Sequence, residues 1–380
     1  MKAKLTLFFF LSFMLMATPS QPVYGQSAGG HITRQKCSVC GKTAQNCPYK
    51  GNHPKSQPTT GTLSITSTPS DAVVKIDGKY MGTTPLTLDK QKVGAYKVTF
   101  SAEGYETTTK SVTIIAGKTA TCSASLKKKQ ASQPVVPQPT TTITTHSSAS
   151  SQTITVNGVS FKMIRVDGGT FTMGTTPEQG SSDIYDFGKP THQVTLSSYY
   201  IGETEVTQAL WEAVMGSNPS NFKGANRPVE NVSLDSCRVF IYKLNSMTGK
   251  NFRLPTEAEW EFAARGGNKS QGYKYSGSNT LGNVAWYTDN NGSETHPVKT
   301  KSANELGIYD MSGNVLELCQ DRWGSYSSTA QTNPAGPSSG SDRVARGGGW
   351  ASGAVGCRVS RRCTISPNFW YDFLGLRLAL

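Results

Sequence analysis

Residues 127–152 constrain the fold more than any other part of this chain. They read KKKQASQPVVPQPTTTITTHSSASSQ, a segment rich in Pro, Ser and Thr. Such a segment cannot bury enough apolar surface to offset the entropy of folding, so we expect an extended and mobile linker. The 380 residues of the chain must therefore form separate folded units before and after this linker.

The N-terminus, residues 1–25, has the pattern of a cleaved signal peptide. Lys2 and Lys4 precede an apolar run from Leu5 to Met16, and small residues then lead to a cleavage site before Gln26. The run is too short to span a bilayer, and no later segment approaches the ~20 apolar residues that a span needs. No cysteine directly follows the cleavage site. We therefore expect no lipid anchor and a protein that is periplasmic or secreted.

The positive charge of the chain is confined to its first part. The formal net charge is +13, and residues 1–151 hold 17 Lys and Arg against 5 Asp and Glu, whereas residues 152–380 hold 21 against 20. No nucleic-acid-binding module accompanies this excess, so nucleic acid is not expected as a partner. A basic N-terminal region on an exported protein favours peripheral contact with anionic envelope polymers or lipid surfaces.

Residues 26–60 form a basic tail that contains a cluster of soft ligands. Two cysteines separated by two residues, a later cysteine and a histidine are spaced like the ligands of a tetrahedral zinc ion. An oxidising compartment instead favours disulfides among these thiols, with a further partner such as Cys122 for the one left over. The third alternative is that neither forms. The ligands of the zinc alternative are Cys37, Cys40, Cys47 and His53.

Residues 61–126 read as a small all-β unit. Runs that alternate apolar and polar residues are separated by Asp77-Gly78, by Gly82 to Pro85 and by later glycines, which is the pattern of short strands. Pro69-Ser70-Asp71-Ala72 stands among these runs. The segment resembles the PEGA domain, a small β-sandwich of bacterial envelope proteins, with Ser and Asp replacing Glu and Gly of its name-giving tetrad. The resemblance implies a binding or spacer module without catalysis.

Residues 153–380 mix strand and helix patterns. The stretch from Asn157 to Gly174 alternates on either side of Gly168-Gly169, which predicts a hairpin with its turn at the two glycines. Ser233 is placed to cap a later helix. The apolar face of that helix would consist of Cys237, Phe240, Ile241 and Leu244. Cys237 is therefore expected in the core and not as a nucleophile.

The segment RLPTEAEWEFAARGG, residues 253–267, carries the clearest helix signal. Thr256 at the N-cap and Glu259 three residues later form a capping box, and Gly266 is placed to end the helix. Glu257, Glu259 and Glu261 look like candidates for acid–base chemistry. Capping and solvation account for them without chemistry, and we favour that interpretation.

Several motifs follow one another in this part of the chain. In order they are GGTFTMG (168–174), EVT (205–207), RLPTEAEWE (253–261), GIYDMSGNV (307–315), RGG (346–348) and GLR (375–377). Together, from about residue 158 to the C-terminus, they resemble the formylglycine-generating enzyme (sulfatase-modifying factor) family. The resemblance implies an α+β fold similar to C-type lectins, with few long elements and much irregular loop. The 38 glycines of the chain agree with that fold.

The resemblance also implies an oxidase that acts on a substrate cysteine with copper and oxygen. Two cysteine thiolates are needed, because two soft ligands hold Cu(I) and leave room for the substrate sulfur. Counted from Gly347, Ser352 stands at the first cysteine position and Cys357 at the second. Counted back from Ser366-Pro367, Cys357 precedes the next strand and the loop before it is short. In either register the pair is absent, so copper is not expected.

Other positions near this segment support the same conclusion. Leu316 and Leu318 stand where the enzymes of the family carry Trp. The C-terminal arginines are then available to pair with internal carboxylates or to bind an anion, and we favour internal pairing. They are Arg346, Arg358, Arg362 and Arg377.

Members of the family hold calcium in the segment that matches GIYDMSGNVLE, residues 307–317. Two carboxylates and two backbone carbonyls there form a ligand mixture that calcium favours, and these ligands are Asp310, Gly313, Val315 and Glu317. A second calcium loop of the family matches Asn283 and Val284 together with residues 289–292. The alternative is a turn held by Asp and Asn side chains.

These features favour an exported, non-catalytic binding or scaffolding protein of the bacterial envelope, with an envelope protein or a glycan as its ligand. The alternative is an enzyme of the family, either the formylglycine-generating oxidase acting on a sulfatase cysteine or a relative with different chemistry. Fold alone cannot separate the two, so the site has to be examined.

Overall fold

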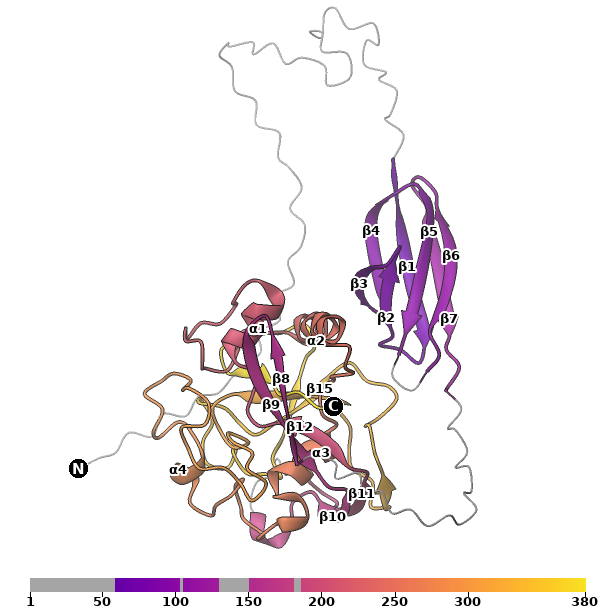
Figure 1. The fold of residues 1–380 in the computed structure, drawn as a ribbon. Coiled ribbons are helices and arrows are strands. Elements are labelled where there is room, and N and C mark those ends of the chain that lie inside the picture. The colour runs from indigo at the N-terminus through magenta and orange to yellow at the C-terminus, as the bar shows by residue number, and fades with distance from the viewer. Residues whose placement is uncertain (1–58, 103–104, 130–149, 181–185) are drawn as a thin grey trace, which may run out of the picture. The chain divides into compact units, whose positions relative to one another are not determined.

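The computed structural model describes residues 59–102, 105–129, 150–180 and 186–380 (Figure 1). The predicted signal peptide, the cluster of Cys37, Cys40, Cys47 and His53, and most of the predicted linker lie outside these residues. Within the described residues there is a small all-β domain and a larger α+β domain. No helix in these ranges is long and apolar enough to cross a membrane.

The small domain is a β-sandwich. One of its sheets has the order β4-β1-β7, with β1 antiparallel to β4 and parallel to β7, and the other has the order β3-β2-β5-β6. The strands are β1 (Thr60–Thr68), β2 (Val73–Ile76), β3 (Lys79–Thr83), β4 (Leu86–Lys92), β5 (Gly94–Ser101), β6 (Thr108–Ile114) and β7 (Thr119–Ser125).

Alternation in the sequence builds this sandwich. Every second residue of β1 from Gly61 to Ile65 is buried, and the inner faces of both sheets meet in one apolar core that includes Val98 and Phe100. Cys122 packs in the same core and carries a free thiol. Asp77 and Gly78 have φ values of 49° and 85°, so they form the tight turn between β2 and β3 that the sequence predicts.

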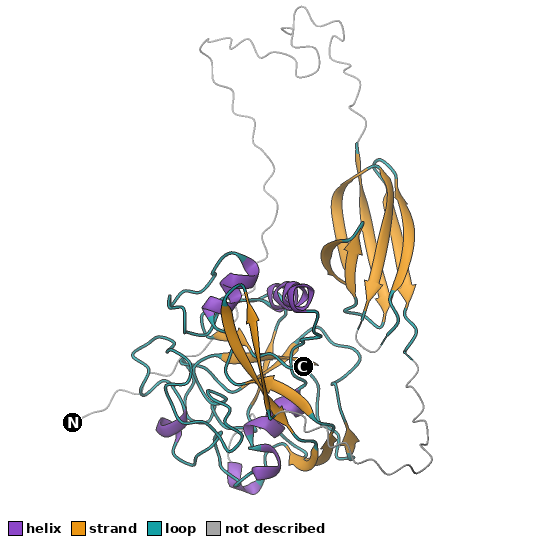
Figure 2. Ribbon diagram, in the orientation of Figure 1, coloured by secondary structure: helices purple, strands orange, loops and turns teal. Residues whose placement is uncertain are grey.

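The large domain combines short helices and strands with long loops (Figure 2). Its helices are α1 (Gln208–Met215), α2 (Leu234–Thr248), α3 (Glu257–Ala264) and α4 (Leu281–Val284), and its 3₁₀ turns are η2 (Pro177–Gln179) and η3 (Gly267–Lys269). Its strands are β8 (Ser151–Val156), β9 (Val159–Val166), β10 (Gly169–Met173), β11 (His192–Leu196), β12 (Tyr199–Gly202), β13 (Leu316–Arg322), β14 (Gln331–Thr332), β15 (Arg343–Arg346), β16 (Arg362–Ile365) and β17 (Leu374–Leu376). The sheet orders are β12-β9-β8, β10-β11-β14 and β16-β15-β13-β17. The α+β prediction is confirmed.

The predicted hairpin at Gly168-Gly169 is wrong. β9 pairs with β8 across the turn Asn157-Gly158 and with β12 on its other side, whereas β10 pairs with β11. Asn157 and Gly158 have φ values of 46° and 80°, the left-handed conformation that a two-residue type I′ turn requires. Gly168 serves close packing instead, because a Cβ atom there would lie 2.5 Å from the carbonyl oxygen of Leu196.

The predicted helix starts are confirmed. The Ser233 hydroxyl accepts the Ser236 N–H at the start of α2, and the Thr256 hydroxyl accepts the Glu259 N–H at the start of α3. The C-cap of α3 is Arg265, and Gly266, with φ 89°, follows one residue later than the C-cap. Both helix starts depend on side chains within three residues, which is why the sequence reveals them.

Two apolar clusters form the core of the large domain. One packs α1 and α2 against the β8-β9 hairpin and the β13-β17 pair, with Trp211 stacked on Phe240 at a ring distance of 4.8 Å. Cys237 is fully buried in this cluster, which confirms its predicted core position. The other packs Trp260 and Phe262 of α3 against β10, β11 and β15. The apolar side chains of α3 therefore pack on β15, the strand that leads into the C-terminal loops.

Candidate functional site

The glutamates of α3 are not solvated, so that part of the prediction is wrong. Glu259 does accept the Thr256 N–H at 2.9 Å and so completes the capping box. However, Glu257, Glu259 and Glu261 are all buried. Arg253 binds both oxygens of Glu259, at 2.6 and 2.7 Å. Burial with arginine partners, and not exposure to water, keeps these carboxylates in the fold.

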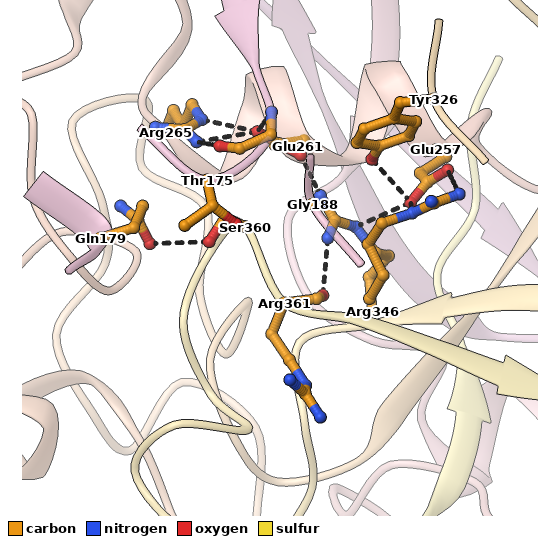
Figure 3. A network of polar contacts seen from close by, with 12 residues as sticks. Thr175, Gln179, Gly188, Glu257, Glu261, Arg265, Tyr326, Arg346, Ser360 and Arg361 are labelled. Atoms are coloured by element: carbon orange, nitrogen blue, oxygen red, sulfur yellow. Dashed lines mark hydrogen bonds and ion pairs between the residues drawn. The ribbon is translucent and has the colours of Figure 1, made fainter. Parts of the chain in front are cut away.

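Glu261 and Arg346 form the centre of a buried ionic network (Figure 3). The carboxylate of Glu261 accepts hydrogen bonds from the Gly174 N–H at 2.9 Å, from Arg265 Nε at 2.9 Å and from Arg346 Nη2. Arg346 is fully buried, and its other terminal nitrogen donates to the Arg361 carbonyl at 2.6 Å. Every oxygen of Glu261 is therefore satisfied by the protein.

Glu257 extends this network towards the C-terminal strand β16. Arg362 donates to both of its oxygens, at 2.6 and 2.8 Å, and the Tyr326 hydroxyl donates to one of them at 3.0 Å. Asp321 accepts the Glu257 N–H at 2.8 Å. Burial, together with the neighbouring charge of Glu257, raises the pKa of Asp321 to about 8.

Internal pairing of the C-terminal arginines is confirmed for three of the four. Arg346 and Arg362 pair with the α3 glutamates, and Arg377 donates to Glu317 at 2.6 Å. Arg358 donates to the Gly180 carbonyl at 3.4 Å instead of to a carboxylate. The arginine-rich C-terminus therefore closes the fold.

Directly after β15 the chain makes a tight turn through two glycines. Gly347 and Gly348 have φ values of 93° and 68°, and a Cβ atom on Gly348 would lie 2.8 Å from the Gly356 carbonyl oxygen. The loop that follows is closed by Ser352, whose hydroxyl accepts the Gly349 N–H at 3.0 Å. Ser352 is thus a partly buried turn residue.

Cys357 lies beneath this loop. Its side chain is fully buried in a small apolar cluster with Tyr275, Val284 and Ala285. Burial, with a smaller contribution from Cys363, raises the pKa of the Cys357 thiol to about 12. The pKa of Cys363 is also raised by burial. Both are free thiols, and at neutral pH both are protonated.

The sequence analysis missed a group of aromatic side chains at this end of the domain. Trp350 donates its indole N–H to the Asp372 carbonyl at 2.9 Å and packs edge-on against Phe222. Tyr371 stacks on Phe373 at a ring distance of 4.8 Å. Beside them Phe369, Trp370 and Tyr371 are 55%, 63% and 38% exposed. The run NFWYDF, residues 368–373, was the available signal, because it places apolar side chains outside any strand or helix pattern.

Glu230 lies next to Phe222, one of these aromatic residues. It is fully buried, and one of its carboxylate oxygens accepts the Phe222 N–H at 2.8 Å. The other oxygen has no hydrogen-bond partner among the described residues. Burial raises the pKa of Glu230 to about 7, while hydrogen bonds from the backbone N–H groups of Phe222 and Asn221 oppose that shift.

The predicted calcium ligands Asp310 and Glu317 are both buried, and the structure brings them near Glu205. Glu205 accepts hydrogen bonds from the Asn314 side chain at 2.8 Å and the Val315 N–H at 3.1 Å. Burial, followed by the charges of Asp310 and Glu317, raises the pKa of Glu205. The pKa of Asp310 is raised by burial to about 6. The carboxylates of Glu205, Asp310 and Glu317 therefore lie near one another, with the buried guanidinium of Arg377 as a positively charged neighbour.

The two carboxylates predicted to bind calcium differ in how they are engaged. Asp310 accepts the Lys299 N–H at 2.8 Å through one oxygen, and its other oxygen is buried without a partner in the described structure. Glu317 accepts hydrogen bonds from Arg377 through both oxygens and from the Trp260 indole at 2.6 Å. Across residues 59–102, 105–129, 150–180 and 186–380, no group of three His, Cys, Asp or Glu side chains is arranged to hold a metal ion. Asp310 therefore keeps one carboxylate oxygen unengaged by the described residues, whereas Glu317 is already paired.

The second predicted calcium loop is held by amide groups. Asn283 is exposed, and its carbonyl accepts the Ser302 N–H at 3.0 Å, while Val284 is buried. Asn290 accepts the Tyr287 N–H and donates to the Ala285 carbonyl. These contacts are those of a side-chain-supported turn. The zinc alternative at Cys37, Cys40, Cys47 and His53 falls outside the described residues and stays a prediction.

Comparisons with known families agree with the resemblances read from the sequence. The profile of the family described as "Sulfatase-modifying factor enzyme 1-like domain" matches residues 149–380. The profile of the PEGA domain matches residues 60–130. Both resemblances are thereby confirmed.

Individual relatives of the large domain carry different names. The chain is 37% identical over 270 residues to chaperone protein LppX of Paenibacillus barcinonensis, covering 58% of this chain and 89% of that protein. It is 29% identical over 286 residues to the formylglycine-generating enzyme of Streptomyces coelicolor, covering 57% of this chain and 88% of that protein. Among solved structures, Treponema denticola variable protein 1 aligns with a TM-score of 0.55 and 38% identity, covering 60% of this chain and 98% of that one. The fold therefore does not decide the chemistry.

Proposed function

Since this chain belongs to the sulfatase-modifying factor enzyme 1-like family, we propose that it is an exported binding protein of the bacterial envelope whose large domain does not catalyse oxidation. The observation that carries this proposal is the environment of Ser352 and Cys357. The Ser352 hydroxyl is engaged in a turn, and the Cys357 thiol is fully buried with its pKa raised to about 12. A copper(I) site that accepts a substrate sulfur needs two accessible thiolates.

The strand beside this loop supports the same proposal. Leu316 and Leu318, at positions where the enzymes carry Trp, are buried in the apolar core that packs α1 and α2. They stabilise the domain from inside and offer no surface to a substrate peptide. The two positions at which the enzymes of the family carry Trp therefore belong to the apolar core of this domain.

The aromatic surface supports a binding function. We define it as Phe222, Trp350, Phe369, Trp370, Tyr371 and Phe373. Exposed aromatic side chains contribute binding energy at little entropic cost and stack against sugar rings as readily as against peptide side chains. An envelope protein or a glycan is the proposed ligand, and the name of the relative LppX, a chaperone, favours a protein. The signal-peptide pattern of residues 1–25 supports the proposal that this binding takes place outside the cytoplasm.

The first experiment separates binding from oxidation. Full-length mature protein is loaded with copper and incubated under oxygen with a peptide that carries a sulfatase-type cysteine, and the peptide mass is measured. We expect an unchanged cysteine. Formation of formylglycine would overturn the proposal and favour the oxidase. The second experiment applies the same protein to glycan and peptide arrays, where binding to either class is expected and binding to neither contradicts the proposal.

Calcium is proposed as a structural ligand of the large domain. Asp310 supports this, because its unpartnered buried oxygen is the kind of acceptor that a hard cation satisfies. The Lys299 N–H occupies only the other oxygen of the same carboxylate. Glu317 already neutralises Arg377, so Asp310 is the side chain that we expect to contribute most to calcium binding.

A further inference from the structure

A cavity lies in the large domain, and none of the residues of the aromatic surface lines it. Its volume is about 300 Å³, at the lower end of the range for small-molecule sites. It lies between β9, the segment that follows β12 and the first turn of α1, elements that are labelled in Figure 1. None of the residues 346–373 lines it. The volume equals that of about ten water molecules in the liquid, which limits the ligand to a small molecule.

Part of the wall of this cavity is apolar. Its partly exposed apolar residues are Val159, Phe161, Ala209 and Val298. Met163 and Leu210 also belong to the lining but are almost fully buried, so they offer little surface to a ligand. An apolar wall of this kind favours a hydrocarbon or aromatic body over a sugar.

The rim of the cavity is charged, with Lys162, Lys299, Glu203 and Glu205 all in its lining. Burial, followed by the charges of Asp310 and Glu317, raises the pKa of Glu205, which favours its neutral form, so the two lysines outweigh Glu203. Glu203 lies between two lysines, with Lys162 Nζ at 3.4 Å from one carboxylate oxygen and Lys299 Nζ at 2.8 Å from the other. The lysine side chains are 41% exposed, whereas that of Glu203 is 14% exposed. Each ammonium has three N–H donors, so the single contact with Glu203 leaves both lysines able to bind a second anion.

From this combination we propose that the cavity binds a small monocarboxylate with an apolar body. The carboxylate accepts hydrogen bonds from Lys162 and Lys299 beside Glu203, and the apolar body contacts Val159, Phe161 and Val298. An amine of the same shape is repelled by the two lysines, and a neutral alcohol gains the apolar contacts without the charge-assisted hydrogen bonds. The site is separate from the aromatic surface, so it stands or falls independently of the function proposed above.

The test uses three probes that share one apolar body: hexanoate, hexan-1-ol and hexylamine. Binding to the full-length mature protein is measured by isothermal titration calorimetry and by chemical-shift changes in the protein's NMR spectrum. We expect millimolar affinity for hexanoate, as befits a ligand with about eight non-hydrogen atoms. We expect weaker binding of the alcohol and none of the amine. Added salt should weaken the binding of hexanoate but not that of the alcohol.

Variants locate the site. Lys162→Gln combined with Lys299→Gln should weaken hexanoate binding roughly tenfold or more, because hydrogen bonds to charged groups are lost. Lys269→Gln changes an exposed lysine that does not line the cavity, and it should bind hexanoate like the wild type. Ala209→Phe fills the cavity from α1 and should abolish binding of both hexanoate and the alcohol. Thermal melting of each variant checks that it is folded.

Three outcomes would overturn the proposal. The first is the absence of hexanoate binding to the wild-type protein. The second is equal affinity for hexanoate and hexylamine, which would remove the role of the two lysines. The third is hexanoate binding that the double lysine variant leaves unchanged. If Ala209→Phe does not fold, the lysine variant and the comparison of probes still decide the question.

Discussion

The carboxylates on α3 and those of Asp310 and Glu230 are equally buried, yet their oxygens are satisfied very differently. Both oxygens of Glu257 and of Glu261 have arginine, tyrosine or backbone donors. Asp310 and Glu230 each keep one buried oxygen without a partner in the described residues. Buried polar groups are nearly always hydrogen-bonded. We therefore expect a cation, a proton or a water molecule to satisfy these oxygens of Asp310 and Glu230.

This difference indicates that the α3 glutamates and the other two buried carboxylates have different roles in the large domain. Both oxygens of Glu257 and of Glu261 are occupied, and these residues connect α3 to β15 and β16 through Arg346 and Arg362. Glu230 instead accepts the Phe222 N–H beside the aromatic surface, and Asp310 belongs to the GIYDMSGNVLE loop. Catalytic chemistry on α3, which three glutamates in one helix suggest, is therefore the less favoured interpretation.

The largest effect is expected from breaking the complete network. Arg346→Met leaves one oxygen of the buried Glu261 carboxylate without its donor, while Arg265 still binds the other. Loss of one member of a buried ion pair costs up to about 3–5 kcal/mol of unfolding free energy. Arg165→Met removes an exposed pair with Asp167 and should leave that free energy unchanged. Urea unfolding of both variants measures the difference.

A double variant sharpens this test. Arg346→Met combined with Glu261→Gln removes the carboxylate charge that has lost one of its two arginine partners, and it should recover part of the lost free energy of unfolding. If Arg346→Met is as stable as Arg165→Met, the network does not hold α3 in place and the contrast drawn above is lost.

A smaller effect is expected from filling an incomplete carboxylate. Calcium that binds only the folded protein stabilises it by about 2.7 kcal/mol at a hundred times its dissociation constant, which raises the melting temperature by roughly 2–4 °C for each kcal/mol. Asp310→Asn should remove this dependence on calcium concentration. Asp235→Asn, at an exposed position of α2, should retain it.

Asp310→Asn is a cleaner probe than a change at Glu317, because removing Glu317 would also leave Arg377 buried without its partner. The measurement is differential scanning calorimetry with calcium chloride and with a chelator. Identical melting temperatures of the wild-type protein under both conditions would mean that the segment is only a turn.

A third effect concerns protonation of Asp321, which accepts the Glu257 N–H. The pKa of Asp321 is raised to about 8, whereas in an unfolded chain it is about 3.9. The folded state therefore holds a proton that the unfolded state has lost between these values. The stabilisation is full below about pH 4, falls as the pH rises, and is lost by about pH 8.

Asp321→Asn isolates this contribution. The amide stays neutral and its oxygen can still accept the Glu257 N–H. Between pH 5 and 8 the wild-type free energy of unfolding should therefore fall relative to that of the variant. Parallel pH profiles from urea unfolding would show that Asp321 is ionised in the folded protein, with the attraction of Arg362 outweighing burial and the charge of Glu257.

The features that could be predicted from the sequence are those in which cause and effect lie close together in the chain. Ser233 and Thr256 begin helices through contacts three residues away. The burial of Glu257 and Glu261 could not be predicted in this way, because their partners Arg362 and Arg346 lie 105 and 85 residues away. A glutamate beside a helix N-cap looks solvated until the distant arginine is known.

The wrong hairpin has a similar origin. Asn157-Gly158 and Gly168-Gly169 both look like turns, and only strand pairing shows that the first connects β8 with β9. Conversely, the aromatic surface depends on loops that bring Phe222 to Trp350, a contact across more than a hundred residues of chain. Loops have no periodic pattern in the sequence. The available signal for this surface was therefore the run of aromatic residues at 368–373.

The smallest effect on stability, and a large one on binding, is expected from Trp370→Ala. The side chain is 63% exposed, so its removal should change the free energy of unfolding by no more than about 0.5 kcal/mol. Exposed tryptophans at the centre of an interface typically contribute 2 kcal/mol or more to binding. Loss of the glycan or peptide bound on the arrays, with unchanged melting temperature, is therefore the expected result. Met247→Ala, which removes a 45% exposed apolar side chain from α2, should leave both quantities unchanged. If Trp370→Ala binds as the wild type does, the aromatic surface is not the binding site.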